Sequence, residues 1–163
     1  VLKTITELSV KHQFMVFGDL QCSSQVGNVS KFKNFDLISP TERESRIALS
    51  TQDEGVEWVA NTLMKKTNSR NLVMKLGREG FIAYESERDG FENRQHFPAL
   101  SINPVDVSGA GDSLLAALSV GLCSGATIMQ SSAIGAGMAS LAVQQLGNIP
   151  VSNKQLKNYI SQI

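Results

Sequence analysis

Eight residues in the second half of the chain combine two carboxylates with three small residues. They read Asp106-Val107-Ser108-Gly109-Ala110-Gly111-Asp112-Ser113, and an apolar run begins at Leu114. Small residues let an anion approach the peptide plane, and a helix predicted to begin here adds unpaired N–H donors and the positive end of its dipole. A carboxylate at the mouth of such an anion hole is a candidate base that accepts a hydroxyl proton during phosphoryl transfer.

This octet resembles the Asp-Thr-x-Gly-Ala-Gly-Asp signature of the ribokinase-like (PfkB) carbohydrate kinases, with Ser108 in place of threonine. The resemblance implies ATP-dependent phosphorylation of a sugar hydroxyl, with Asp112 as the base and the turn Gly109, Ala110 and Gly111 as the anion hole. Asp106 and Ser108 resemble family positions that bind a monovalent cation such as K⁺, which some members do without. The structural alternative is a plain glycine-rich turn that precedes a helix.

A second segment, residues 73–84, has the pattern of two short apolar strands joined by a Gly-x-x-Gly turn at Gly77–Gly80. It resembles the family segment in which a strand ends near the nucleotide, which implies nucleotide contacts at Gly77 and Lys75. Family members usually carry a small polar residue at the position of Lys75. A simple hairpin turn is the alternative.

A third segment, Ile38-Ser39-Pro40-Thr41-Glu42-Arg43-Glu44, resembles the Pro-Asn-x-x-Glu segment of the family. There the glutamate helps to organise magnesium and its water shell, and the asparagine faces the phosphates. The resemblance assigns Glu44 to Mg²⁺, and it assigns Thr41, which replaces the asparagine, to the nucleotide. The same two residues predict a capping box with Thr41 as N-cap and Glu44 at N3, and the two interpretations are compatible.

The elements that position these residues follow from the hydrophobic pattern. Strands are predicted at residues 14–19, 35–38 and 72–76, with helices beginning at Thr41 and Asp53 between them, and the chain opens in a helical pattern from Leu2. After a charged turn at residues 85–90 and an extended piece at 93–98, three helices are predicted at 110–124, 127–145 and 152–162.

The middle helix of the last three is rich in small residues, which permit a close approach of another helix or of a ligand. In the family the corresponding helix lines the adenine pocket, which makes Ala136 a candidate cofactor-binding position without a polar contact. Tight packing against the signature helix is the alternative.

The order of strands and helices, with loops of a few residues, predicts an α/β fold with a mostly parallel sheet. The resemblance implies a ribokinase-like three-layer αβα fold of which residues 1–163 are only the C-terminal, nucleotide-binding portion, because family members are longer. Residues 98–113 and 139–152 look most like the heptose-7-phosphate kinases, which are sometimes fused to an adenylyltransferase.

Composition narrows the function classes. Fifteen basic and fifteen acidic residues cancel, which argues against nucleic acid or an anionic membrane as a partner. No stretch reaches the roughly 20 apolar residues of a membrane span. Cys22 and Cys123 are too few for a disulfide framework, which fits a reducing cytoplasm. The ligands that the family resemblance implies are ATP, Mg²⁺ and a small sugar, and a homodimer is left open.

Two rival functions remain at this stage. A non-catalytic nucleotide-binding module derived from the same family would explain the departures at Lys75, Thr41 and Ala136. A Rossmann-type dinucleotide enzyme would also be α/β, but its glycine motif follows the first strand, whereas here the motif comes late and lies between two aspartates. The second rival is therefore disfavoured.

Overall fold

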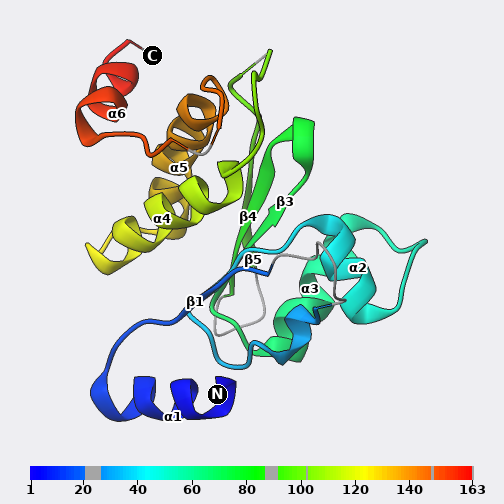
Figure 1. Cartoon of the computed structure of the whole chain (residues 1–163). Coiled ribbons are helices and arrows are strands. Elements are labelled where there is room, and N and C mark those ends of the chain that lie inside the picture. The colour runs from blue at the N-terminus through cyan, green and yellow to red at the C-terminus, as the bar shows by residue number, and fades with distance from the viewer. Residues whose placement is uncertain (21–26, 87–91, 102, 148, 163) are drawn as a thin grey trace. The chain divides into compact units, whose positions relative to one another are not determined.

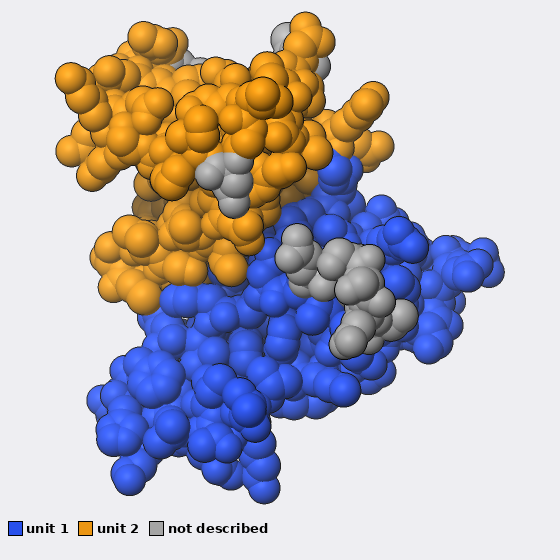
Figure 2. Space-filling view, in the orientation of Figure 1, with its two compact units in different colours: residues 1–77, 82–95 blue, residues 78–81, 96–163 orange. Residues whose placement is uncertain are grey.

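The computed structural model describes residues 1–20, 27–86, 92–101, 103–147 and 149–162. The chain forms two compact units, shown in different colours in Figure 2. Unit 1 comprises residues 1–77 and 82–95, and unit 2 comprises residues 78–81 and 96–163. Cys22 and most of the charged turn predicted at residues 85–90 lie outside the described residues.

A five-stranded sheet lies mostly in unit 1, with the strands in the order β1-β2-β3-β4-β5. Figure 1 labels β1, β3, β4 and β5 of this sheet. Strands β1 (Phe17–Gly18), β2 (Leu37–Ile38) and β3 (Asn71–Lys75) are parallel to one another. Strands β4 (Phe81–Ser86) and β5 (Glu92–Phe97) complete the sheet. Because residues 76–80 are too few for a parallel crossover, β3 and β4 form an antiparallel hairpin. The α/β class is confirmed, in a sheet whose parallel part ends at the predicted glycine turn.

Unit 1 also contains helices α1 (Leu2–His12), α2 (Glu42–Leu49) and α3 (Val56–Thr67) and the short 3-10 helix η1 (Val29–Lys31). The helix predicted from Asp53 is α3, which begins later because Gly55 is its N-cap, and Val59, Ala60, Leu63 and Met64 form its buried apolar face. The core of unit 1 joins this face of α3 to buried residues of the strands, namely Ile38, Leu72, Met74 and Tyr84. Burial of apolar area of this kind is the main stabilising term in unit 1.

Unit 2 contains the three predicted helices: α4 (Ala110–Cys123), α5 (Ile128–Ala142) and α6 (Asn153–Ile160). Helices α5 and α6 each begin with a capping box, at Thr127 with Gln130 and at Ser152 with Gln155. Helices α4 and α5 pack closely: a Cβ added to Gly121 would lie 2.4 Å from Ser131 Oγ. The predicted helices are therefore present, with α5 and α6 shorter at both ends.

The structure contains no membrane-spanning candidate within its described ranges, since none of the helices there is both long enough and apolar enough to cross a bilayer.

Candidate functional site

The site residues predicted from the sequence divide between the two units. Unit 2 contains Asp106, Ser108, the turn at 109–111, Asp112 and Ala136. Unit 1 contains Thr41, Glu44, Lys75 and Gly77.

The signature turn ends in a left-handed glycine that starts α4. Gly109 is the N-cap of the helix, with φ 76° and ψ 0°, a backbone conformation that costs an L-residue with a side chain extra free energy. Gly111 lies inside the first turn of α4 and is not among the glycines with positive φ. Of the signature glycines, Gly109 is therefore the one whose conformation requires the absence of a side chain.

The first turn of α4 leaves several backbone donors available. The N–H of Ser113 donates to the carbonyl of Gly109, and the N–H of Ala110 donates to the carbonyl of Val107 at 3.3 Å. No hydrogen bond to another described residue is made by the N–H groups of Gly109, Gly111 or Asp112. Unpaired N–H groups at a helix N-terminus suit an anion. The N–H of Ala110, a residue predicted as part of the anion hole, already donates to the carbonyl of Val107.

Asp112 occupies the third position of α4 and its side chain is exposed. Within the described residues, its carboxylate makes no hydrogen bond or ion pair. The helix dipole stabilises a carboxylate in the first turn of a helix, so the charge of Asp112 is stabilised at this position even without a ligand. The group is thus an exposed carboxylate in the same helical turn as backbone N–H groups that have no partner among the described residues, and its role as a base stays a prediction.

Asp106 fastens the signature turn to the segment that follows α5. Its Oδ1 accepts from the N–H of Ser108 at 2.9 Å, and its Oδ2 accepts from the N–H of Gly147 at 3.0 Å. Hydrogen bonds from the backbone and hydroxyl of Ser108, and from the backbone of Gly147, lower the pKa of Asp106 below its ordinary value of 3.8. The N–H groups of Val105 and Asp106 both donate to the carbonyl of Val143. This carboxylate therefore has a positioning role that sequence reasoning missed.

Ala136 is buried in α5 among the small residues of that helix. Its neighbours serve helix packing: a Cβ on Gly135 would lie 2.7 Å from Leu114 Cδ1 of α4, and one on Gly137 would lie 3.5 Å from the Tyr159 ring of α6. Close helix packing therefore accounts for Gly135, whereas a Cβ on Gly137 would make only an ordinary van der Waals contact with α6. A contact between Ala136 and adenine stays a prediction.

In unit 1, Thr41 and Glu44 form the predicted capping box at the start of α2. The N–H of Glu44 donates to Thr41 Oγ1 at 3.2 Å, and the N–H of Thr41 donates to Glu44 Oε2 at 2.7 Å. Glu44 is buried, with 6% of its surface exposed. The structural interpretation of this segment is confirmed, and its assignment to Mg²⁺ and to the nucleotide stays a prediction.

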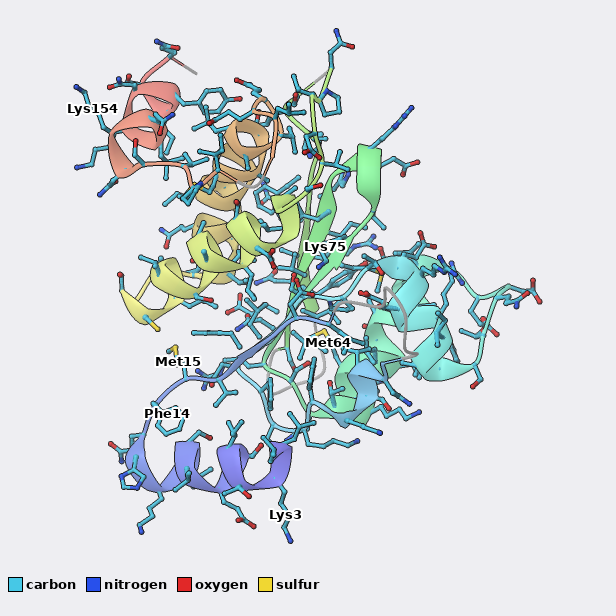
Figure 3. The ribbon with its side chains drawn as sticks, viewed as in Figure 1. Lys3, Phe14, Met15, Met64, Lys75 and Lys154 are labelled. Carbon is cyan, nitrogen blue, oxygen red and sulfur yellow. The ribbon has the colours of Figure 1, made fainter. Side chains whose placement is uncertain are left out.

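Lys75, labelled in Figure 3, ends β3 and forms an ion pair with Asp19, which directly follows β1. Its Nζ lies 2.8 Å from each of the two carboxylate oxygens of Asp19. The side chains of Lys75 and Asp19 are 18% and 16% exposed. The backbone N–H of Lys75 donates to the carbonyl of Pro40 at 2.9 Å, next to Thr41. The predicted nucleotide ligand Lys75 is thus already partnered by a carboxylate.

Gly77 follows at the start of the 3-10 helix η2 (Gly77–Glu79) with φ +63°, and a Cβ there would meet nothing within 4 Å. Gly80 has φ +89°, and a Cβ there would lie 2.1 Å from the carbonyl oxygen of Phe97. Both glycines are therefore explained by the turn itself, and Gly77 in addition leaves open space beside its backbone.

No group of three or more His, Cys, Asp or Glu side chains that could hold a metal lies within the residues that the structure describes. Mg²⁺ does not require a group of three protein ligands, because it retains water and binds through one or two carboxylates together with substrate phosphates. The buried carboxylate of Glu44 fits this donor requirement in type. Each oxygen of Asp106 already accepts an N–H, so a monovalent cation would use the remaining lone pairs.

Residues 11–155 match the family model described as "pfkB family carbohydrate kinase". Among individual relatives, the Bifunctional protein HldE of Trichlorobacter lovleyi is 26% identical over 159 residues, which cover 96% of this chain and 31% of that protein. The Bifunctional protein HldE of Geotalea uraniireducens is 30% identical over 126 residues, which cover 75% of this chain and 25% of that protein.

Solved structures of similar fold were also found. A ribokinase from Thermotoga maritima matches with a TM-score of 0.78 at 23% identity, covering 98% of this chain and 53% of that one. A phosphofructokinase-2 from Escherichia coli in complex with potassium matches with a TM-score of 0.81 at 18% identity, covering 99% and 51%. The ribokinase-like fold is thereby confirmed. The chain spans about a third or less of the length of these curated relatives and about half of these solved structures.

Proposed function

The chain belongs to the pfkB family of carbohydrate kinases, and from that premise we propose that it serves the ATP-dependent phosphorylation of a sugar hydroxyl. The observation that carries the proposal is the start of α4. There an exposed carboxylate, Asp112, lies in the same helical turn as backbone N–H groups that have no partner among the described residues.

In this proposal Asp112 accepts the proton of the sugar hydroxyl as that oxygen forms its bond to the γ-phosphorus of ATP and the bond to the β-phosphate oxygen breaks. The carboxylate is free to take the proton, since it makes no hydrogen bond within the described part of the chain. Proton acceptance by a positioned side chain contributes typically about 10²–10⁴-fold to rate.

The backbone of the signature turn is proposed to stabilise the charge on the transferred phosphoryl group. The N–H groups of Gly109, Gly111 and Asp112 are the available donors, and a preorganised donor of this kind contributes about 3–4 kcal/mol to the transition state. The left-handed conformation of Gly109 fixes the turn before substrate arrives. Asp106 and Ser108 hold that turn, and we retain them as candidates for a monovalent cation.

For unit 1 we propose roles in nucleotide and metal binding. Glu44 would hold Mg²⁺ through the water shell of the ion, and the ion would offset the negative charge of the ATP phosphates. Thr41 and Gly77 would lie near the nucleotide, because ligands of open α/β sheets bind beyond the carboxyl ends of the parallel strands. Ala136 of unit 2 would contribute a small, apolar surface to the base.

We further propose that residues 1–163 are the nucleotide-binding, C-terminal portion of the kinase domain, and that the reaction takes place in the cytoplasm. What supports the first statement is that the chain spans only about half of each solved structure with this fold. The acceptor that we propose is a heptose 7-phosphate, on the resemblance of residues 98–113 and 139–152 to kinases of that substrate.

The test is a panel of sugars and sugar phosphates assayed for ADP release with ATP and Mg²⁺ in the intact kinase. Phosphorylation of a heptose 7-phosphate that is lost in Asp112→Asn supports the proposal. If another sugar is turned over with the same dependence on Asp112, the proposed reaction stands and that sugar replaces heptose 7-phosphate as the proposed acceptor. Turnover that is indifferent to Asp112 overturns the assignment of the base.

A second candidate, a non-catalytic nucleotide-binding module, is favoured by one observation in unit 1. Thr41, Glu44 and Lys75 are each engaged by another group of the protein, in the capping box and in the ion pair with Asp19. Titration with Mg²⁺-ATP separates the candidates: binding without sugar-dependent ADP release in the intact protein would favour the module.

A further inference from the structure

The ion pair between Lys75 and Asp19 joins the carboxyl ends of two strands that are not neighbours. In the register of the sheet, Gly18 of β1 is paired with Ile38 of β2, and Ile38 is paired with Leu72 of β3. Asp19 therefore lies one residue beyond this row of paired residues on β1. Lys75 lies three residues beyond it on β3, and its long side chain reaches Asp19 past the end of the intervening strand β2. The pair therefore lies at the edge where open α/β sheets bind their ligands.

Because the pair is partly buried, loss of the lysine would leave the charge of Asp19 poorly solvated. The two side chains are less than one fifth exposed, and both carboxylate oxygens of Asp19 accept from the same ammonium group. A buried carboxylate is tolerated when it is paired, whereas removal of its partner leaves an uncompensated charge.

The two arginines of α2 do not take the place of Lys75 as the partner of Asp19. Arg46 is held by Glu42 and by the carbonyls of Gln52 and Glu54, and Arg43 is exposed on α2. Lys75 is therefore the cation that the structure pairs with Asp19. Without its ammonium, the edge would present an unpaired negative charge to any polyanion.

We propose that Lys75 is a positioning residue that acts on the nucleotide through Asp19: it neutralises that carboxylate and holds it at the carboxyl ends of β1 and β3, so that a nucleoside triphosphate can approach. This inference rests on the proposed function, because it supposes that the ligand at this edge is a nucleotide. It differs from direct binding of phosphate by Lys75, which would require the ammonium to leave Asp19.

The two mechanisms differ in what a double substitution does. Lys75→Met keeps the apolar stem but leaves the charge of Asp19 without a cation, although Asp19 Oδ1 still accepts from the N–H of Leu20. Mg²⁺-ATP binding therefore weakens by about tenfold, the size expected for one uncompensated charge near a polyanion. Asp19→Asn combined with Lys75→Met removes both charges and restores the dissociation constant to within about threefold of wild type. A lysine that touched phosphate would give no such recovery.

The experiment is an NMR titration of the four proteins, wild type, Lys75→Met, Asp19→Asn and the double variant, with Mg²⁺-ATP. Lys65→Met is the matched control, because Lys65 is an exposed lysine of α3 and its loss changes net charge equally. The weakening in Lys75→Met should shrink as ionic strength rises, which loss of packing alone would not produce. Thermal melts report whether each variant folds, and if Lys75→Met does not, Lys75→Gln replaces it as the single substitution with which the double variant is compared.

Binding that stays as weak in the double variant as in Lys75→Met overturns the inference and makes Lys75 a direct ligand. An unchanged dissociation constant in Lys75→Met also overturns it. If wild type shows no binding of Mg²⁺-ATP at all, the proposed function of this chain fails, and the inference fails with it.

Discussion

The carboxylate of Asp112 is the residue on which the proposed reaction depends most. Asp112→Asn keeps the shape of the side chain but removes its capacity to take a proton. We expect the intact kinase to lose at least about 10²-fold in kcat, while Mg²⁺-ATP binding stays the same or tightens because a negative charge near the phosphates is removed. Steady-state kinetics together with a direct binding measurement check this. Turnover within a few-fold of wild type would remove Asp112 from the role of base.

Gly109 and Gly111 differ in backbone conformation, and the difference predicts opposite effects of alanine. Gly109 is left-handed, so Gly109→Ala should destabilise unit 2 by about 1 kcal/mol. Gly111 lies in α4, where alanine is a better helix former by up to about 1 kcal/mol, so Gly111→Ala should be neutral or stabilising. Urea denaturation of the two variants measures the contrast.

A larger side chain at Gly111 tests the anion hole itself. Gly111→Val places a branched side chain beside N–H groups that have no partner among the described residues, and turnover should fall through steric exclusion of the phosphate. Gly111→Ala is the matched control for loss of the glycine. Normal kinetics in a folded valine variant would mean that this turn binds no anion.

Asp106 predicts a pH dependence whose sign follows from its lowered pKa. Because the folded pKa lies below the ordinary 3.8, the contribution of the carboxylate is fully present above pH 3.8 and is lost as the pH falls through the folded value. Asp106→Asn should therefore be less stable than wild type near neutral pH, and the gap should close in acid. Urea midpoints over a pH series measure it. A gap that persists below the folded pKa would contradict the role of the charge.

At the scale of elements, the turn between β3 and β4 depends on Gly80. Gly80→Ala would bring a Cβ to 2.1 Å from the carbonyl oxygen of Phe97 in a left-handed conformation, so backbone must move. We expect a loss of about 3 kcal/mol or more. Gly77→Ala is the matched control: it has the same sign of φ but open space, so it should cost about 1 kcal/mol. Equal losses in urea denaturation would show that the contact with Phe97 does not matter.

Helices α4 and α5 illustrate why small residues in a sequence support two interpretations. Gly121 and Gly135 allow α4 and α5 to approach each other, which is a structural demand that a ligand pocket would also satisfy. The pattern alone could not separate packing from adenine binding, because both require the absence of side-chain volume. The contacts with Ser131 and Leu114 show that packing is sufficient for these two glycines.

At the scale of the whole molecule, we expect residues 1–163 to fold but to phosphorylate no sugar alone. The continuous core of unit 1 and the packed helices of unit 2 support folding. Positioning of the acceptor is the larger part of phosphoryl-transfer catalysis, and the chain spans only about half of the solved structures of this fold. Weak Mg²⁺-dependent ATP binding should remain.

The measurement is ADP release from ATP and Mg²⁺ with each sugar, compared with the same reaction without sugar. A mock purification controls for contaminating kinases. Clear sugar-dependent ADP formation by this chain would place the acceptor site within these residues.

The sequence by itself determined the α/β class, the capping box at Thr41 and Glu44, and the helix after the signature. These features are local: hydrophobic period, capping residues and glycines act within one or two turns of chain. The family also followed from sequence, because the signature octet keeps two aspartates and small residues at fixed spacing, and the family match over residues 11–155 confirms it.

Only the tertiary structure decided which charges meet. Asp19 and Lys75 are far apart in sequence, and their pairing requires the parallel register of β1, β2 and β3. The hydrogen bond from Gly147 to Asp106 likewise depends on how the chain returns after α5. Long-range partners of this kind carry no local sequence signal, since a lysine at a strand end is equally compatible with solvent, phosphate or a carboxylate. The fold selects among them by burial, which leaves a charge stable only where its partner is within reach.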